Sequence, residues 1–194
     1  MKDAYSFDLD FEGSKRSYNK QFVAYLKTFK RMGLTAIPMK ADSGPIGGDM
    51  SHEFVILADT GESEVGCHRD LLENEWLNTI DLEGDLQVVV DSFTDKYAAT
   101  DEERDPETEA ALGDDLIVGR GIEVGHIFYF GNKYSKAMNA LVAGEIDVHN
   151  VFLVTIGVDP EQTKCPAMGT CSCQQDIAVV SNSQSASVIT APVT

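Results

Sequence analysis

Apolar side chains recur at helical spacing over residues 15–32 and predict an amphipathic helix there. Its apolar positions are Tyr18, Phe22, Tyr25, Leu26, Phe29 and Met32. Gly33 follows them as a typical C-terminal stop signal. The same spacing predicts a second helix over 86–97, despite its three consecutive valines, and a short third helix over 133–141.

Four short apolar segments predict β-strands. The first two lie at 34–39 and 52–58, and the third, at 63–67, alternates after the turn Asp59-Thr60-Gly61, which predicts a hairpin with the second. Residues 122–130 are apolar and aromatic, as in a buried central strand. These elements predict an α+β fold, with an antiparallel sheet flanked by helices.

Three segments lack a period. The stretch 43–48 holds three glycines around Pro45 and predicts a turn. Residues 100–115 are acidic and contain Pro106 and Gly113, which predicts a solvated loop or linker. The last residues, 181–194, are mostly Ser, Thr, Ala and Val, and we expect them to fray.

Composition places the chain among globular proteins, with 43% hydrophobic and 24% charged residues. Its formal charge of -17 repels a phosphate backbone and argues against a nucleic-acid-binding surface. No apolar run approaches the roughly 20 residues that cross a bilayer, and the start MKDAYSFD is unlike a signal peptide. We therefore expect a cytoplasmic protein without membrane contact.

Two groups of residues invite a chemical interpretation. Ser51, His52 and Glu53 are adjacent, but neighbours on a strand point to opposite faces and cannot form a relay among themselves. Thiols and an imidazole that could bind zinc occur near the C-terminus, at Cys165, Cys171, Cys173 and His149. Their spacing matches no common zinc motif, so they are weak candidates and we predict no metal site.

Three stretches of the chain together resemble a known family. They read MKDAYSFD, GPIGGDMSHEFVILADTGESEV and RGIEVGHIFYFGNKYSKAM. In this order and spacing they are similar to the bacterial prolyl-tRNA synthetases, which are class II aminoacyl-tRNA synthetases. The resemblance runs from Met1 to about Ala140 and implies an α+β piece of the class II catalytic core.

The resemblance divides the chain into four parts. Residues 1–70 correspond to the end of the second signature motif and the core sheet, and residues 120–143 to the strand and helix of the proline pocket. Residues 71–119 correspond to a reduced insertion, too short for an editing domain. Residues 144–194 depart from the family pattern and form a divergent tail.

Site residues follow from the resemblance alone. Asp3 would face the proline amine, where an ion pair gains strength away from water. One wall of the proline pocket would consist of His126, Phe128 and Tyr134. Supporting positions would be Met1, His52 and Glu53. The implied cofactors are ATP and Mg²⁺, and the implied partners are proline, ATP and tRNA(Pro).

Several family features have no counterpart in this sequence. The first motif, the phosphate-gripping Arg and the Glu of the second motif, and the anticodon-binding domain are missing, and no arginine follows Arg120. We therefore expect an incomplete core without measurable adenylation on its own, unless Lys2 or Arg120 substitutes for the missing cations. Whether this chain is itself an enzyme stays open.

Other interpretations use the same residues. The chain could be a non-catalytic interaction protein that docks on another synthetase chain through a sheet edge. It could also be a truncated relic, or a protein whose cysteine-rich tail binds zinc. Direct tRNA binding is disfavoured by the acidic charge.

Overall fold

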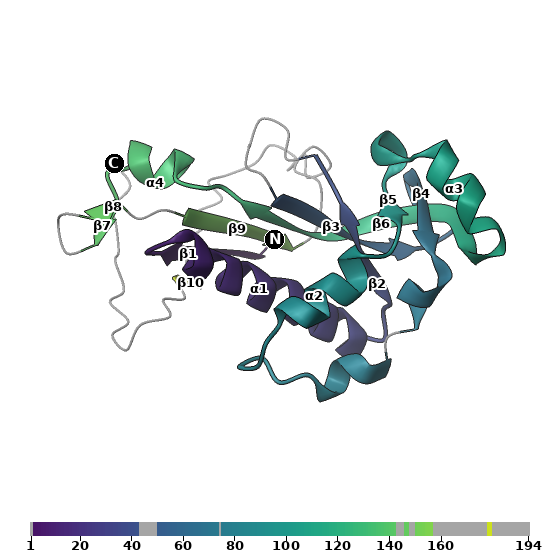
Figure 1. Cartoon of the computed structure of the whole chain (residues 1–194), viewed down its shortest axis with the longest axis horizontal. Helices are drawn as coiled ribbons and strands as arrows, with labels where there is room; N and C mark the ends of the chain where they lie inside the picture. Colours follow the sequence, from purple (N-terminus) through teal and green to yellow (C-terminus); the bar gives the residue numbers. More distant parts are fainter. Residues whose placement is uncertain are drawn as a thin grey trace, which may run out of the picture.

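The computed structural model describes residues 2–42, 50–73, 75–142, 146–147, 150–156 and 178–179 (Figure 1). The α-helices are α1 (Phe11–Arg31), α2 (Gln87–Thr94), α3 (Pro106–Leu112) and α4 (Lys133–Ala137). The strands are β1 (Lys2–Asp8), β2 (Ala36–Lys40), β3 (Met50–Leu57), β4 (Ser63–His68), β5 (Ala98–Ala99), β6 (Leu116–Tyr129), β7 (Leu141–Val142), β8 (Ile146–Asp147), β9 (Asn150–Ile156) and β10 (Ala178–Val179). Short 3₁₀ turns occupy Arg69–Leu72, Glu75–Thr79, Asp101–Glu103 and Gly113–Asp115.

Helix α1 confirms the first predicted helix, although it begins at Phe11 rather than at residue 15. The Asp10 side chain caps its N-terminus by accepting a hydrogen bond from the Gly13 N–H at 2.6 Å. At the other end Gly33 has φ 77°, and the Leu34 N–H bonds the Phe29 carbonyl at 2.9 Å. This left-handed glycine ends the helix as the sequence predicts.

The strands form a mixed sheet, and the prediction of a plain antiparallel sheet is wrong. The strand order is β10-β1-β9-β6-β3-β2-β5-β4, and β4 also pairs with β6. Strands β6, β3, β2, β5 and β4 therefore close into a five-stranded barrel, which β9, β1 and β10 extend beyond β6. The β2–β5 and β1–β10 pairs are parallel, while the other pairs in this sheet are antiparallel.

Barrel closure depends on the length of β6, which begins at Leu116 rather than at residue 122. Its first residues pair with β4 and its later residues with β3, with a register shift at Phe54/Val55. The predicted hairpin between β3 and β4 is wrong, because β4 pairs with β5 and β6 instead.

A close backbone approach explains why β4 lies where it does. A Cβ atom on Gly61 would lie 2.5 Å from the backbone N and O of Gly121, and one on Gly121 would lie 2.4 Å from Val55 Cγ1. Only glycines allow this contact, which lets the chain cross β6 after β3. Strand β4 thereby reaches β6 instead of folding back on β3.

Helix α1 covers one face of the sheet (Figure 1). Its apolar side chains form the main core with residues of β2, β3, β4 and β6 and with α2. The largest fully buried side chains are Tyr18, Phe22, Phe54, Leu26, Ile37, Met39, Leu71, Leu77, Ile127, Val23 and Val65. Aromatic edge contacts join Phe22 to Phe54 and to Phe93 of α2, with ring centroids 5.3 and 6.2 Å apart.

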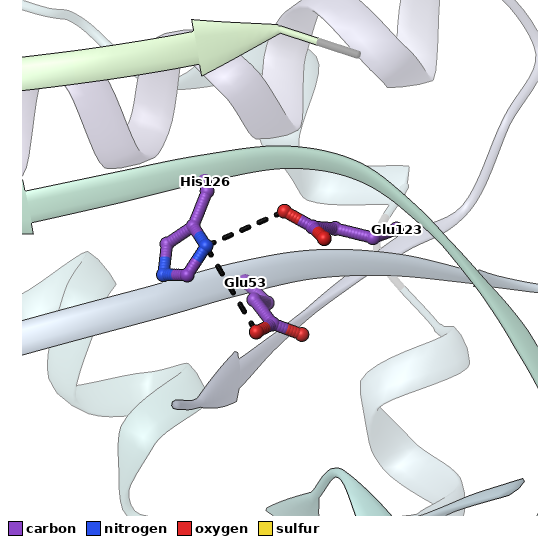
Figure 2. Close-up of side chains that lie close together, drawn as sticks. All are labelled: Glu53, Glu123 and His126. Carbon is purple, nitrogen blue, oxygen red and sulfur yellow. Dashed lines mark ion pairs between the residues drawn. The ribbon is translucent and has the colours of Figure 1, made fainter. Parts of the chain in front are cut away.

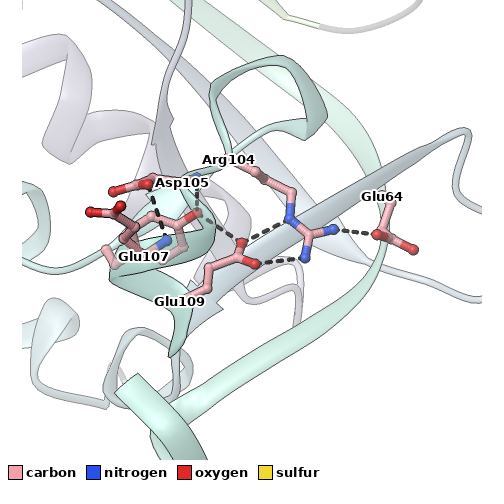
Figure 3. A network of polar contacts seen from close by, with 6 residues as sticks. Glu64, Arg104, Asp105, Glu107 and Glu109 are labelled. Carbon is pink, nitrogen blue, oxygen red and sulfur yellow. Dashed lines mark hydrogen bonds and ion pairs between the residues drawn. The ribbon is translucent and has the colours of Figure 1, made fainter. Parts of the chain in front are cut away.

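The acidic stretch 100–115 is a folded, docked segment, so the prediction of a loop is wrong. Asp105 caps α3, Pro106 occupies its first turn, and the Arg104 guanidinium holds Glu109 through N–O contacts of 2.7 and 2.9 Å. Arg104 also pairs with Glu64 of β4 (Figure 3). The positive charge beside these carboxylates lowers the pKa of Glu109, and the two carboxylates raise the pKa of Arg104. The segment is exposed as expected, yet fixed to the barrel.

The remaining predictions have mixed outcomes. The second predicted helix is confirmed as α2, whereas the third is shorter than predicted and ends at Ala137. The turn at 43–48 and the tail at 181–194 lie outside the described residues. The four-part division stays a prediction, although β9 joins part of 144–194 to the main sheet. Among the described residues, no helix is long and apolar enough to span a membrane.

Candidate functional site

The candidate site lies on the sheet face opposite α1, where β3 and β6 run side by side. Glu53 pairs with His126 across these strands, and Ser51 pairs with Phe128. Because side chains alternate along a strand, these four point to the same face, whereas Ile127 and Tyr129 point toward α1. The two faces of β6 accordingly belong to different buried clusters.

Both ring nitrogens of His126 have polar neighbours, and Figure 2 shows the two at Nδ1. Its Nε2 lies 2.6 Å from the Ser51 hydroxyl. Its Nδ1 lies 3.3 Å from Glu123 Oε1 and 3.9 Å from Glu53 Oε1. Burial and the nearby charge of Glu123 raise the pKa of Glu53, while His126 opposes this shift.

A row of aromatic rings continues from His126 toward α4. The imidazole is stacked on Phe128, with centroids 3.8 Å apart and planes at 20°. Phe128 is followed by Phe130 at 6.0 Å, and Tyr134 of α4 meets Phe130 edge-on at 4.9 Å. Tyr5 and Phe7 of β1 pack against the cluster formed by Phe128 and Phe130. The sequence-predicted residues His126, Phe128 and Tyr134 thus share one surface.

His52 lies on the other face, as the alternation of Ser51, His52 and Glu53 requires. The Tyr18 hydroxyl lies 2.6 Å from its Nδ1, and Phe22 meets the ring edge-on. Burial, and then the charges of His126 and Lys40, lower the pKa of His52 to about 4. The expectation that these three adjacent residues form no relay among themselves is confirmed, and a supporting role for His52 stays a prediction.

Other predicted residues are placed only in part. Asp3 lies on β1, where its backbone pairs with Thr155 of β9. Met1 and the zinc candidates lie outside the described residues: His149, Cys165, Cys171 and Cys173. Arg120, a possible substitute for a phosphate-binding cation, donates instead to the Gly61 carbonyl at 2.5 Å and to the Glu62 carbonyl at 3.2 Å.

Sequence reasoning missed Glu123 as a site residue. The only available signal was its position three residues before His126 on a predicted strand, which by strict alternation would place it on the opposite face. The register shift at Phe54/Val55 explains the difference. Phe54 pairs with Gly125 but Val55 pairs with Glu123, so β6 has one extra residue here, which returns Glu123 to the face of His126. Glu53, Glu123 and His126 bring one ligand atom each to within 4.8 Å of one another, a donor set that could hold a divalent cation.

Curated proteins are similar to this sequence over most of its length. A proline–tRNA ligase of Rhizorhabdus wittichii is 63% identical over 145 residues, or 74% of this chain, and one of Rhodospirillum rubrum is 58% identical over 159 residues, or 81%. A third, from Rhizobium meliloti, is 55% identical over 82% of the chain. The chain is related to the proline–tRNA ligases. It spans only about a third of these relatives, 33%, 36% and 37% of their lengths.

No protein-family model matches the chain. The similarity to proline–tRNA ligases therefore rests on the pairwise comparisons, which agree with the family resemblance in the sequence. The match covers one part of these longer ligases.

Proposed function

We propose that this chain provides the proline-facing part of a proline–tRNA ligase core. The observation that carries the proposal is the continuous row His126–Phe128–Phe130–Tyr134, on the same face as Ser51, Glu53 and Glu123. An aromatic surface can pack against an apolar ring, and nearby carboxylates can pair with a charged amine. Proline has both an apolar ring and a charged amine.

In this proposal the pyrrolidine ring packs against His126, Phe128 and Tyr134, and the Asp3 carboxylate faces the secondary ammonium. Strands β1 and β6 lie on either side of β9, so the backbone brings Asp3 into the same sheet as His126. Met1, His52 and Glu53 would support this surface. The arrangement as a partial class II core is part of the same proposal.

Activation of proline by ATP and Mg²⁺ and transfer to tRNA(Pro), in the cytoplasm, would be activities of the complete ligase. Activation requires cations against the ATP phosphates. In the described structure Arg120 already binds two carbonyl oxygens of the Gly61–Glu62 turn, so it is not poised for that role. The missing cations would come from another synthetase segment or chain, and the charge of -17 disfavours direct tRNA binding by this one.

Proline-dependent ATP–pyrophosphate exchange tests the activation step without tRNA. We expect no exchange by the 194-residue chain alone and measurable exchange when it is mixed with a fragment carrying the missing ligase motifs. Exchange by the chain alone would contradict the need for external cations. Absence of exchange in the mixture would instead favour a non-catalytic scaffold.

Direct proline binding, followed by NMR, tests the aromatic surface by itself. We expect Phe128→Ala to weaken binding, because the ring in contact with His126 is lost. Phe11→Ala is the matched control, since Phe11 is an exposed aromatic residue that contacts Tyr129, on the α1 side of β6. Equal losses in both variants, or proline binding unaffected by Phe128→Ala, would reject the proposed surface.

A further inference from the structure

The imidazole of His126 is held from both sides, and the partners differ in hydrogen-bonding capacity. A carboxylate can only accept, whereas a hydroxyl can both donate and accept. Glu123 Oε1 lies 3.3 Å from Nδ1, and Ser51 Oγ lies 2.6 Å from Nε2. Because the carboxylate can only accept, it determines which ring nitrogen carries the proton.

A neutral imidazole beside an ionised Glu123 therefore carries its proton on Nδ1. Nε2 then keeps its lone pair and accepts the Ser51 O–H. This is the reverse of the tautomer that free histidine prefers in water. In proteins, the polar partner of one ring nitrogen commonly fixes the tautomer of a histidine. For His126 the partner of Nδ1 is a carboxylate.

The two carboxylates have unequal weight. Glu123 is nearer to Nδ1 and its side chain is 52% exposed, whereas that of Glu53 lies 3.9 Å from Nδ1 and is 24% exposed. Burial and the charge of Glu123 raise the pKa of Glu53. Glu123 thus places the nearer negative charge beside Nδ1, with Glu53 behind it.

The order carboxylate, imidazole, hydroxyl resembles a nucleophile relay, but Ser51 is poorly suited to attack a substrate. It is 5% exposed, and its own backbone carbonyl accepts the Ala41 N–H from beside β2 while it pairs with Phe128 of β6. A hydroxyl enclosed in this way orients the ring and does not meet a ligand. The network acts through His126, whose face is parallel to that of Phe128.

We infer that Glu123, assisted by Glu53, is a positioning residue that fixes His126 as the Nδ1–H tautomer with its ring against Phe128. Without it, the imidazole can change tautomer or turn, and the start of the aromatic row is no longer defined. The consequence for ligand binding rests on the proposed function, because it assumes that proline packs on this row. The tautomer itself does not depend on that assumption.

Long-range ¹⁵N–¹H NMR of the whole chain, labelled at its four histidines and without ligand, reads the tautomer directly. The His126→Gln variant assigns the signal. We expect Nδ1–H in the wild type, a shift toward Nε2–H in Glu123→Ala, and a smaller shift in Glu53→Ala. Glu123→Gln should shift the tautomer less than Glu123→Ala, because its amide oxygen can still accept although its NH₂ group can also donate.

Glu73→Ala is the matched control, since it removes an equally charged and exposed side chain from another surface. A wild-type signal for Nε2–H, or no change in Glu123→Ala, would overturn the inference. Loss of the Nδ1 proton on adding Zn²⁺ at micromolar concentration would also overturn it, because the three groups would then form a metal site. Amide spectra of each variant show that it remains folded.

Adding proline to the same samples separates this inference from the proposed function. We expect Glu123→Ala to bind proline roughly tenfold more weakly, the lower end of the cost of losing an orienting partner at a metal-bound histidine. A tautomer change with unchanged proline affinity would uphold the positioning role and reject the proposed proline surface. An unchanged tautomer with weaker affinity would reject the positioning role alone.

Discussion

The two faces of β6 are made from alternate residues of one strand, yet their chemistry is opposite. Toward α1, Ile127 is fully buried in the main apolar core and Tyr129 meets Phe11 edge-on. On the other face, Phe128 and Phe130 form a smaller aromatic cluster beside a buried imidazole. A single strand therefore serves both stability and the candidate site.

The two faces of β6 contribute differently to the stability of the fold. Burial of apolar area toward α1 stabilises the fold at roughly 25 cal/mol per Å². The carboxylates and imidazole on the other face lose hydration and need partners, as the raised pKa of Glu53 indicates. Polar groups kept at such a position are better explained by binding than by stability.

The largest difference between the faces should appear on truncating one aromatic ring on each. Phe22→Ala removes a ring with 0% exposure that contacts His52, Phe54 and Phe93, and should lower the free energy of unfolding by about 3–5 kcal/mol. Phe128→Ala should cost less, because its cluster is smaller. Urea unfolding measures both, and equal losses would remove the distinction between the faces.

The faces should also differ in the sign of their pH dependence. His52 has a pKa of about 4 in the folded state, against an ordinary value of 6.5, so between these values the unfolded state binds more protons. Its contribution is complete above pH 6.5 and falls by about 3 kcal/mol as the pH drops to 4. Glu53, whose pKa is raised, acts oppositely: its contribution is present at low pH and is lost as the pH rises through its folded pKa.

Urea unfolding between pH 4 and 7.5 checks this prediction. The wild type should lose stability on acidification, and His52→Gln should remove most of that loss while leaving an acceptor for the Tyr18 hydroxyl. Glu53→Gln should steepen the loss instead, because the opposing group is gone. Parallel curves for all three proteins would show that neither residue titrates as inferred.

A smaller effect should come from the crossing that closes the barrel. Gly61→Ala forces a Cβ against the Gly121 backbone and should cost about 1–3 kcal/mol in urea unfolding, because backbone atoms must move. Gly84→Ala is the control, since its nearest contact would be an ordinary 3.4 Å. Because His126 pairs with Glu53 and Thr155, away from the Gly61–Gly121 crossing, its ring proton should be unaffected. A changed tautomer would show that barrel and site are coupled.

The smallest effect should come from loosening the docked acidic segment. Arg104→Lys keeps the charge but loses the paired contacts to Glu109, and should change global stability by about 1 kcal/mol or less. Limited proteolysis within residues 105–115 should nevertheless become faster, whereas Arg16→Lys, at an exposed position, should leave it unchanged. Unchanged cleavage would mean that Arg104 does not hold α3 on β4.

Local patterns predicted the elements whose signals lie within one segment. Gly33 marks the end of α1 and its apolar stripe fixes the buried face, whereas the start that Asp10 caps was missed. The missed helix α3 also had such a signal, because Asp105 followed by Pro106 is a typical helix start, but its acidic composition outweighed it. The family resemblance in turn named His126, Phe128 and Tyr134, which the structure brings together.

The sequence by itself therefore determined the α1 helix, the alternation that separates Ile127 from Phe128, and the relation to proline–tRNA ligases. Only the tertiary structure decided that β4 pairs with β6, that Arg104 fixes the acidic segment, and that Glu123 reaches His126. The reason is physical. Helical period and strand alternation are properties of neighbouring residues, whereas strand partners, register shifts and ion pairs depend on contacts between residues distant in the chain.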